Sequence, residues 1–288
     1  MKVARTLAEL GSAERAVAIG TFDGVHRGHR SAIEAAIETR LRSTVVTFDP
    51  HPRRVLGYDV ELVTTLERRI ELIDEIGPDE LLVLEFTEEL SRLQPEEFVR
   101  EVLQPLGART VVAAATFRFG KGRRGDVQLL RDLGLEVRDV PLVPDVSSSR
   151  VRELLRAGDV ANTARLLGRP PEVEGTVVSG DQRGGTLGFP TANIAVEPGL
   201  LVPANGIYAG LAEGFRAAAS IGVNPHYGGT ERRIEAFLLD FEGDLYGARL
   251  RLELWERLRD ERAFASEEEL VRQIAADVEA ARAADRPS

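Results

Sequence analysis

The residues with the clearest chemical potential in this 288-residue chain include two histidines, His26 and His29, in the segment GTFDGVHRGH. Imidazole nitrogens can donate to phosphate oxygens, and glycines such as Gly20 and Gly24 let a backbone approach a ligand closely. The segment follows a short apolar run, Ala16–Ile19, and precedes a pattern with helical spacing. We therefore predict a phosphate site where a buried strand turns into a helix.

A second candidate lies in the stretch GTVVSGDQRGGTLGFPTANI, residues 175–194. Glycines such as Gly180 and Gly185 would let backbone amides approach the phosphates of ATP. Thr191 and Asn193 are two residues apart, so in extended backbone their side chains point to one side. A hydroxyl and an amide carbonyl are oxygen ligands suited to Mg²⁺, and we expect both residues to be metal ligands.

Glu235 is the candidate general base. It lies in the segment IEAFLLDF, where a period of two puts it on one face with Phe237, Leu239 and Phe241. A carboxylate on an apolar face is costly unless it has a task or a partner, and partial desolvation would suit it to take a proton from a hydroxyl. The alternative is a glutamate at a strand edge that reaches solvent.

A third motif, VSSSRVRELL, lies at residues 146–155. Ser147 and Ser148 precede a helical pattern and could donate to phosphate at its N-terminus, while Arg150 could neutralise charge on a leaving pyrophosphate. The alternative is an ordinary serine N-cap.

Strand and helix patterns alternate in the first half of the chain, which predicts an α/β domain with a parallel sheet covered by helices on both faces. Ligands in such folds bind at the carboxyl ends of the strands, where the two histidines fall. The expected strands are Ala16–Gly20, Thr44–Phe48, Glu80–Leu84, Thr110–Ala115 and Glu136–Val140, and the expected helices are Arg30–Arg42, Leu66–Ile76, Pro95–Leu106 and Asp126–Leu133.

After the Gly/Pro cluster at residues 168–171 the pattern changes to short strands between glycine-rich turns, which predicts a small antiparallel β-barrel. A C-terminal helix is expected over Ser266–Arg282, with a capping box from Ser266 and Glu269. We therefore predict two domains, 1–169 and 170–288. The expected barrel strands are Val173–Val178, Gly206–Ala212, Ala218–Val223, Ile234–Phe241 and Leu250–Leu258.

Composition narrows the function classes. The net charge of −10 argues against a general nucleic-acid binder, and the absence of cysteine excludes disulfides and thiolate chemistry. The N-terminus lacks the apolar core of a signal peptide, and no apolar run approaches the length of a membrane span. We expect a soluble cytoplasmic protein that binds neither nucleic acid nor membrane; nothing in the sequence indicates its oligomeric state.

Taken together, these motifs resemble those of bacterial bifunctional riboflavin kinase/FAD synthetases. The resemblance rests on the histidine segment, TFDPHP at 47–52, FRFGKGRRGD at 117–126, the string ending in PTAN at 190–193, IGVNPHYGG at 221–229 and LYG at 245–247. It implies a Rossmann-like nucleotidyltransferase domain followed by a riboflavin kinase barrel. The barrel would convert riboflavin and ATP, with Mg²⁺, into FMN, and the first domain would convert FMN and a second ATP into FAD and pyrophosphate.

The resemblance assigns residues to both reactions. For adenylyl transfer it implies ATP-phosphate binding by Gly20, Phe22, Gly24, His26, His29, Ser147, Ser148 and Arg150, with both histidines catalytic. For the kinase it implies ATP binding by Gly180, Arg183, Gly185, Thr191 and Asn193, with Glu235 as the base.

Three positions depart from the family pattern, and the first of them raises an alternative. Ala114-Ala115-Thr116 replaces the usual glycine and an Asn or Asp, Phe237 replaces a histidine, and His226 replaces a threonine. One hydroxyl cannot reproduce a two-point amide contact. The alternatives are a riboflavin kinase with a weak or silent adenylyltransferase domain, and a non-catalytic flavin- or nucleotide-binding regulator.

Overall fold

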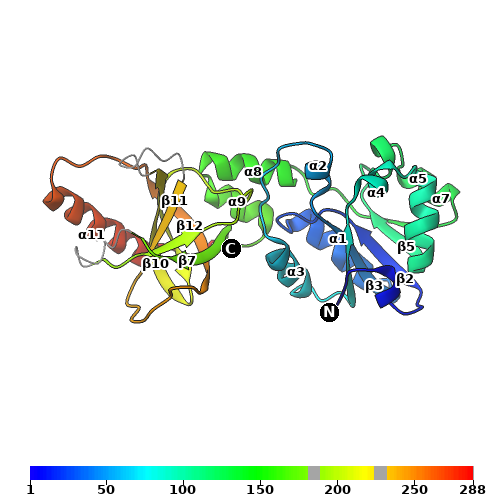
Figure 1. Cartoon of the computed structure of the whole chain (residues 1–288), viewed down its shortest axis with the longest axis horizontal. Helices are drawn as coiled ribbons and strands as arrows, with labels where there is room; N and C mark the ends of the chain where they lie inside the picture. The colour runs from blue at the N-terminus through cyan, green and yellow to red at the C-terminus, as the bar shows by residue number, and fades with distance from the viewer. Residues whose placement is uncertain (181–188, 224–231, 288) are drawn as a thin grey trace. The chain divides into compact units, whose positions relative to one another are not determined.

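The chain divides by its own packing into two units, Met1–Ser148 and Ser149–Ser288 (Figure 1). A computed structural model describes residues 1–180, 189–223 and 232–287. The first unit has a hydrophobic core on each face of a sheet, and the second has a core inside a barrel.

The first unit contains a six-stranded, fully parallel sheet in the order β1-β4-β3-β2-β5-β6. All five predicted strands are confirmed; β1 was not predicted, because it has only three residues and two of them are exposed. The strands are β1 Lys2–Ala4, β2 Arg15–Ile19, β3 Arg42–Asp49, β4 Glu80–Glu85, β5 Ala108–Ala113 and β6 Glu136–Asp139.

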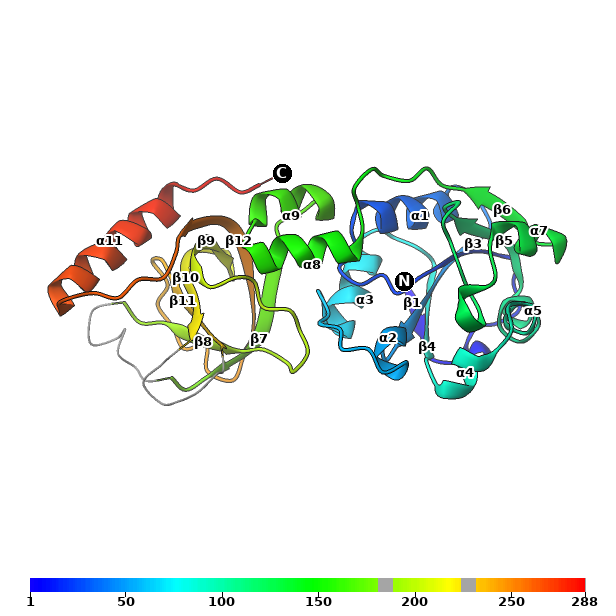
Figure 2. The ribbon, with the colours of Figure 1, turned by 90° about the horizontal axis from the view of Figure 1, so that it is seen from above.

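Helices cover both faces of this sheet, as predicted (Figure 2). Alternate residues of β2 serve the two cores, with Ala16 and Ala18 on one face and Val17 on the other. Helices α1 (Arg27–Ile37) and α3 (Leu66–Asp74) pack on the first face, and the segment α5–α6 and α7 (Val127–Asp132) pack on the second.

Two helices differ from their predicted bounds. Helix α1 begins at Arg27 and ends at Ile37, because His26 caps its start and the chain enters β3 at Arg42. The predicted helix over 95–106 is divided into α5 (Pro95–Phe98), a π-helical turn at Val99–Leu103 and α6 (Gln104–Leu106). Pro105 has no N–H and its ring crowds the carbonyl four residues earlier, which a wider turn relieves. The short helices α2 (Pro52–Val55) and α4 (Glu88–Arg92) were not predicted.

Strand β2 hydrogen-bonds to β3 on one side and to β5 on the other. The chain leaves β2 towards α1 on one face of the sheet and leaves β5 towards α7 on the opposite face. The two connections therefore diverge at the carboxyl edge, which creates the crevice where ligands bind in open α/β sheets.

A buried ion pair lies at the opposite, amino-terminal edge of the sheet. The Arg15 and Glu80 side chains are each 2% exposed, and Arg15 Nε lies 2.7 Å from Glu80 Oε2. Arg15 also donates to the carbonyls of Leu106 and Gly11, each at 2.7 Å, and Thr44 donates to Glu80 at 3.0 Å. This network joins β2, β3 and β4 to the end of α6.

The second unit is built around a closed antiparallel barrel in the order β10-β11-β8-β7-β12-β9, as predicted. All five expected barrel strands are present, and the additional β8 was not predicted because it has only four residues and Asn193 interrupts their apolar run. The described strands are β7 Glu172–Val178, β8 Ala192–Ala195, β9 Gly206–Ala212, β10 Phe215–Val223, β11 Arg232–Leu238 and β12 Arg249–Arg259.

Three helices accompany the barrel. The predicted C-terminal helix is α11 (Glu267–Ala283), capped by Ser266, whose hydroxyl accepts the Glu269 N–H at 3.2 Å; it packs against β9 and β10. Helices α8 (Ser148–Ala157) and α9 (Val160–Leu167) precede β7, and Val160 joins the barrel core. Packing thus divides the chain at Ser148/Ser149, before the predicted domain boundary at 169/170. The predicted boundary itself stays a prediction.

Candidate active sites

The loop between β2 and α1 is held in an unusual backbone conformation. Phe22, Gly24 and Val25 have positive φ angles of 49°, 79° and 38°. Asp23 is fully buried, and its carboxylate accepts the Val63 N–H at 2.9 Å. Such strain at non-glycine residues persists only where the surroundings over-determine it, and it concentrates at functional sites.

The two histidines of this loop lie against each other. Their rings stack with centroids 3.6 Å apart and planes 13° from parallel. His26 is the N-cap of α1, because its Nδ1 accepts the backbone N–H of His29 at 3.2 Å. A neutral His26 therefore carries its proton on Nε2, which leaves that nitrogen as the donor available to a ligand.

His29 is kept uncharged by its surroundings. Burial lowers its pKa well below the ordinary value, and the neighbouring His26 and Arg69 lower it further. Its Nδ1 is covered and has no hydrogen-bond partner in the described part of the chain, and its ring lies 5.0 Å from that of Phe22. The loop thus presents an uncharged His29 beside the Nε2 side of His26.

Arg69 is a residue of this site that the sequence analysis missed. It projects from α3, is 1% exposed, and its Nη1 donates to the Phe48 carbonyl at 3.3 Å. Burial lowers its pKa, while Asp23 and Asp49 act in the opposite direction. An arginine at a position of α3 that faces the core was the available signal, since charged residues are rarely buried without a partner.

The serine motif reaches the histidine loop directly. Ser148 Oγ donates to the carbonyl of Asp23 at 2.9 Å, so this hydroxyl supports the loop. Ser147 is exposed. Arg150 belongs to the second unit, where it forms an ion pair with Glu153 at 2.7 Å. Of the predicted phosphate-binding residues Ser147, Ser148 and Arg150, Ser148 is the one that hydrogen-bonds to the histidine loop.

The first departure from the family pattern, Ala114–Thr116, lies in a turn after β5. Phe117 N–H donates to the Ala114 carbonyl at 2.8 Å, and Thr116 is exposed. The adjacent FRFG loop is fixed by Phe119, which is buried against Phe98. His51 of the TFDPHP segment caps α2 by accepting the Arg53 N–H at 3.2 Å.

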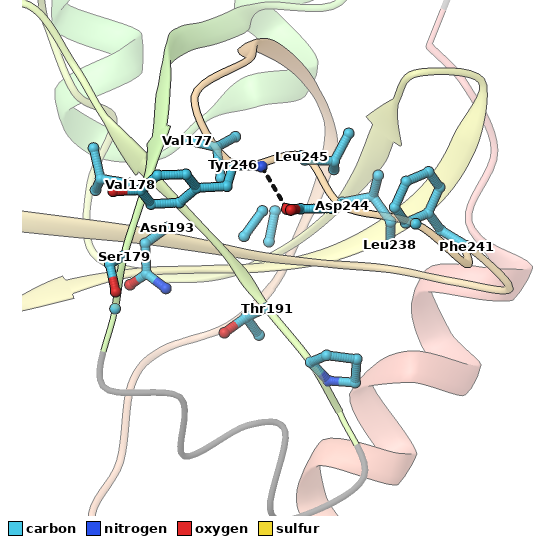
Figure 3. A pocket seen from close by; sticks show the side chains of 15 residues that line it. Val177, Val178, Ser179, Thr191, Asn193, Leu238, Phe241, Asp244, Leu245 and Tyr246 are labelled. Carbon is cyan, nitrogen blue, oxygen red and sulfur yellow. Dashed lines mark hydrogen bonds between the residues drawn. The ribbon is translucent and has the colours of Figure 1, made fainter.

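The barrel carries a pocket of about 230 Å³. Figure 3 shows polar groups of Ser179, Thr191 and Asn193 towards one end of it, and Leu238 and Phe241 towards the other. Its described lining comprises Val177–Gly180, Pro190–Asn193, Ala236, Leu238, Phe241 and Gly243–Tyr246. A pocket lined by both polar and apolar groups suits a ligand that joins a phosphate group to a flat ring.

Thr191, Asn193 and Glu235 share one face of the barrel wall. Glu235 is paired in register with Asn193, and Thr191 Oγ1 lies 3.4 Å from Glu235 Oε2, to which it donates. Gly180 packs directly against Asn193, since a Cβ on it would lie 2.1 Å from the Asn193 amide nitrogen. The expected juxtaposition of these residues is therefore present.

The expected environment of Glu235 needs a correction. The apolar face of β11 consists of Ile234, Ala236 and Leu238, which belong to the barrel core. Glu235 and Phe237 are half-buried on the opposite face, where Phe237 packs edge-on against Phe189. A period of two places residues on a shared face but does not say which face is the core.

Several predicted positions lie outside the described residues, namely Arg183, Gly185 and His226. Within the described ranges, no group of three or more His, Cys, Asp or Glu side chains could hold a metal ion. A divalent cation at the barrel site would therefore depend on hydroxyl, amide and phosphate oxygens.

Family models match both halves of the chain. The FAD synthetase model covers residues 10–152, which include the histidine loop and the serine motif, and the riboflavin kinase model covers residues 167–284. A bifunctional riboflavin kinase/FMN adenylyltransferase from Bacillus subtilis is 36% identical over 92% of this chain and 90% of its own length. The chain belongs to the bifunctional riboflavin kinase/FMN adenylyltransferase family.

Other relatives of the riboflavin kinase/FMN adenylyltransferase family agree over nearly the whole length. The Escherichia coli K12 protein of that name is 34% identical over 96% of both chains. A crystal structure described as a macrolide-efflux protein from Streptococcus pneumoniae is 30% identical, covers 98% of both chains and has a TM-score of 0.88. In the described part of this chain, none of the helices combines the length and apolar character that crossing a membrane requires.

Proposed function

We propose that this protein phosphorylates riboflavin to FMN with ATP and then adenylylates FMN to FAD with a second ATP. The observation that carries this proposal is the presence of two separate phosphate-type sites, one in each unit. Family models of a riboflavin kinase and of an FAD synthetase match the two halves that contain them. The substrates are therefore small molecules: riboflavin, FMN and ATP.

In the kinase step, the ribityl hydroxyl of riboflavin attacks the γ-phosphorus of ATP, the bond to the β-phosphate oxygen breaks, and ADP leaves. Glu235 accepts the hydroxyl proton. The Thr191 hydroxyl donates to Oε2 of this carboxylate, which orients it, and Oε1 accepts no hydrogen bond from the described residues. A fixed carboxylate with one open oxygen suits a general base.

The residues around Asn193 fit Mg²⁺. Thr191 and Asn193 offer a hydroxyl and an amide oxygen beside the Glu235 carboxylate, and Mg²⁺ prefers such hard oxygen ligands together with phosphate and water. When bound, the ion neutralises charge on the ATP phosphates. Gly180 lies against the Asn193 side chain, so a larger residue at position 180 would displace this amide.

In the adenylyl transfer, a phosphate oxygen of FMN attacks the α-phosphorus of ATP, and pyrophosphate leaves with the electron pair of the broken bond. No covalent enzyme intermediate is needed, so positioning and charge stabilisation supply the catalysis. The Nε2–H of His26 and the neutral His29 are hydrogen-bonding groups for the phosphates at the start of α1. Ser148 supports this loop from behind.

The test is a single incubation of the purified protein with riboflavin, ATP and Mg²⁺, followed by chromatographic separation of riboflavin, FMN and FAD. We expect FAD. FMN alone would leave a kinase with a silent adenylyltransferase, the alternative that Ala114–Thr116 raises. A protein that binds flavin but forms no product would be a regulator.

Two variants assign the sites. Glu235→Gln removes the base, so FMN formation should fall by about 10²-fold or more, whereas a regulator would be indifferent to it. His29→Ala should suppress FAD formation from added FMN while FMN formation from riboflavin continues. Equal loss of FMN formation from riboflavin and of FAD formation from added FMN in either variant would contradict separate sites.

A further inference from the structure

The loop after β5 exposes a group of positive charges. Lys121, Arg123 and Arg124, which we call the cationic tip, are all exposed, on a chain whose net charge is −10. None of the three has an ion pair with another residue of the described part of the chain. Other exposed arginines of this unit, such as Arg92 and Arg100, instead pair with a neighbouring carboxylate.

The loop that carries the cationic tip has a fixed conformation. Phe119 and Gly125 exchange two backbone hydrogen bonds of 3.1 and 3.0 Å, which close the loop at its base. Gly125 lies under the Phe119 ring, because a Cβ there would be 2.7 Å from it. The Lys121 N–H donates to the Leu93 carbonyl at 2.8 Å. The three cations are thus presented by a braced loop and not by a free segment.

The cationic tip and the histidine loop follow neighbouring strands. The tip lies in the connection after β5, and the histidines lie in the connection after β2, which hydrogen-bonds to β5. The two connections run to opposite faces of the sheet, so they flank the crevice at its carboxyl edge. A ligand bound at the start of α1 therefore has the tip on the opposite side of the crevice.

The two histidines themselves supply little positive charge, and the cations beside them are the buried Arg69 and the exposed Arg27. His26 uses Nδ1 as an acceptor and His29 is held neutral. Both substrates of adenylyl transfer, by contrast, carry phosphate charge: ATP its triphosphate and FMN its phosphate monoester. An anion that approaches a chain of net charge −10 is repelled unless local cations counteract the field.

We propose that Lys121, Arg123 and Arg124 bind a phosphate group of the anionic substrates of adenylyl transfer, drawing them into the crevice and favouring FMN over uncharged riboflavin. This inference rests on the proposed function. The shared chemistry is a phosphate group, supplied either by FMN or by ATP. Cations that focus the field of a crevice raise association rates by 10-fold or more, and salt screens the effect.

The experiment uses the full chain with all three residues replaced, K121Q/R123Q/R124Q. FAD formation is measured against FMN and against ATP, each over a range of ionic strength. We expect kcat/KM to fall by about 10-fold at low ionic strength and to lose most of its salt dependence, because the attraction has been removed. The kcat should stay within about twofold, since encounter and not chemistry is affected.

Two controls separate a local effect from a change in net charge or folding. Arg40 is exposed and precedes β3, at the opposite edge of the sheet. Single variants K121Q, R123Q and R124Q are compared with R40Q, which removes the same charge. FMN formation from riboflavin, catalysed by the other unit, should be unchanged in every variant.

The outcomes are distinct. A loss confined to kcat/KM for FMN assigns the tip to the FMN phosphate, and a loss confined to ATP assigns it to the triphosphate. A loss on both supports a shared attraction. A loss of kcat/KM no larger than in R40Q, or an unchanged salt dependence, overturns the inference. The proposed function still stands in that case, because the wild-type protein forms FAD. A wild-type protein that forms no FAD overturns both.

Discussion

Gly180→Ala should disable the kinase by a steric route. The added Cβ would lie 2.1 Å from Nδ2, 2.4 Å from Cγ and 2.6 Å from Oδ1 of Asn193, whereas ordinary van der Waals contact begins at 3.4 Å. The Asn193 amide must therefore withdraw by more than about 1 Å, and a displacement of this size at a catalytic site costs about 10²-fold in rate. Overpacking of this kind also costs about 1–3 kcal/mol of stability.

The assay is the initial rate of FMN formation from riboflavin and ATP, with FAD formation from added FMN measured on the same preparation. We expect the first rate to fall by about 100-fold and the second to stay at the wild-type level. A matched control is Gly11→Ala, because a Cβ at Gly11 meets no atom within 4 Å. This control should leave both rates unchanged.

A double-mutant cycle isolates the cause. If Gly180→Ala acts by displacing the Asn193 amide, it should add less than about threefold to the effect of Asn193→Ala, because the group it displaces is already gone. Effects that multiply fully in G180A/N193A would refute the steric explanation. So would a G180A protein with a wild-type rate of FMN formation.

Further predictions concern the first unit. Glu80→Gln should destabilise it by about 3–5 kcal/mol in chemical denaturation, because the Arg15 charge stays buried without its partner, whereas Glu14→Gln at an exposed ion pair should cost less than about 1 kcal/mol. Because the pKa of His29 is lowered in the folded protein, the unfolded chain binds a proton on this side chain at a higher pH. The free energy of unfolding should therefore be constant above about pH 7 and fall below about pH 6.5, by up to about 1.4 kcal/mol per pH unit. Chemical denaturation of His29→Gln, measured alongside the wild type, should lack this slope. Ser148→Ala should remove about 1 kcal/mol of support from the histidine loop and slow FAD formation severalfold, with no change in FMN formation; a wild-type rate would contradict the supporting role.

The sheet of the first unit was predictable from the sequence because buried parallel strands are short apolar runs with turn residues between them. Three-residue β1 has no such run. Strand β8 was not predicted for a different reason, because Asn193 interrupts its apolar pattern and Thr191 precedes it with a second polar group of the site. A strand is hard to predict from its sequence pattern where functional polar residues take the place of apolar ones.

The site was predictable in its membership more than in its geometry. Sequence spacing put Thr191 and Asn193 on one side of the chain, and the family resemblance added Glu235 to the same site. The structure pairs Asn193 and Glu235 in register. The sequence could not assign Glu235 to the outer face, since both faces of a strand have the same period. Nor could it reveal Arg69, which reaches the histidines from α3 through tertiary packing alone.

Asp23 gives the histidine loop a built-in reporter of its own opening. Its carboxylate accepts the backbone N–H groups of Val63 and Thr64, at 2.9 and 3.1 Å, and these amides belong to a different segment of the chain. Deuterium can replace these amide hydrogens only when their hydrogen bonds to the Asp23 carboxylate break. The hydrogen-exchange rates of these two amides therefore report how often the loop opens in the absence of nucleotide. A bound nucleotide that keeps the loop closed should slow exchange at both amides by the same factor.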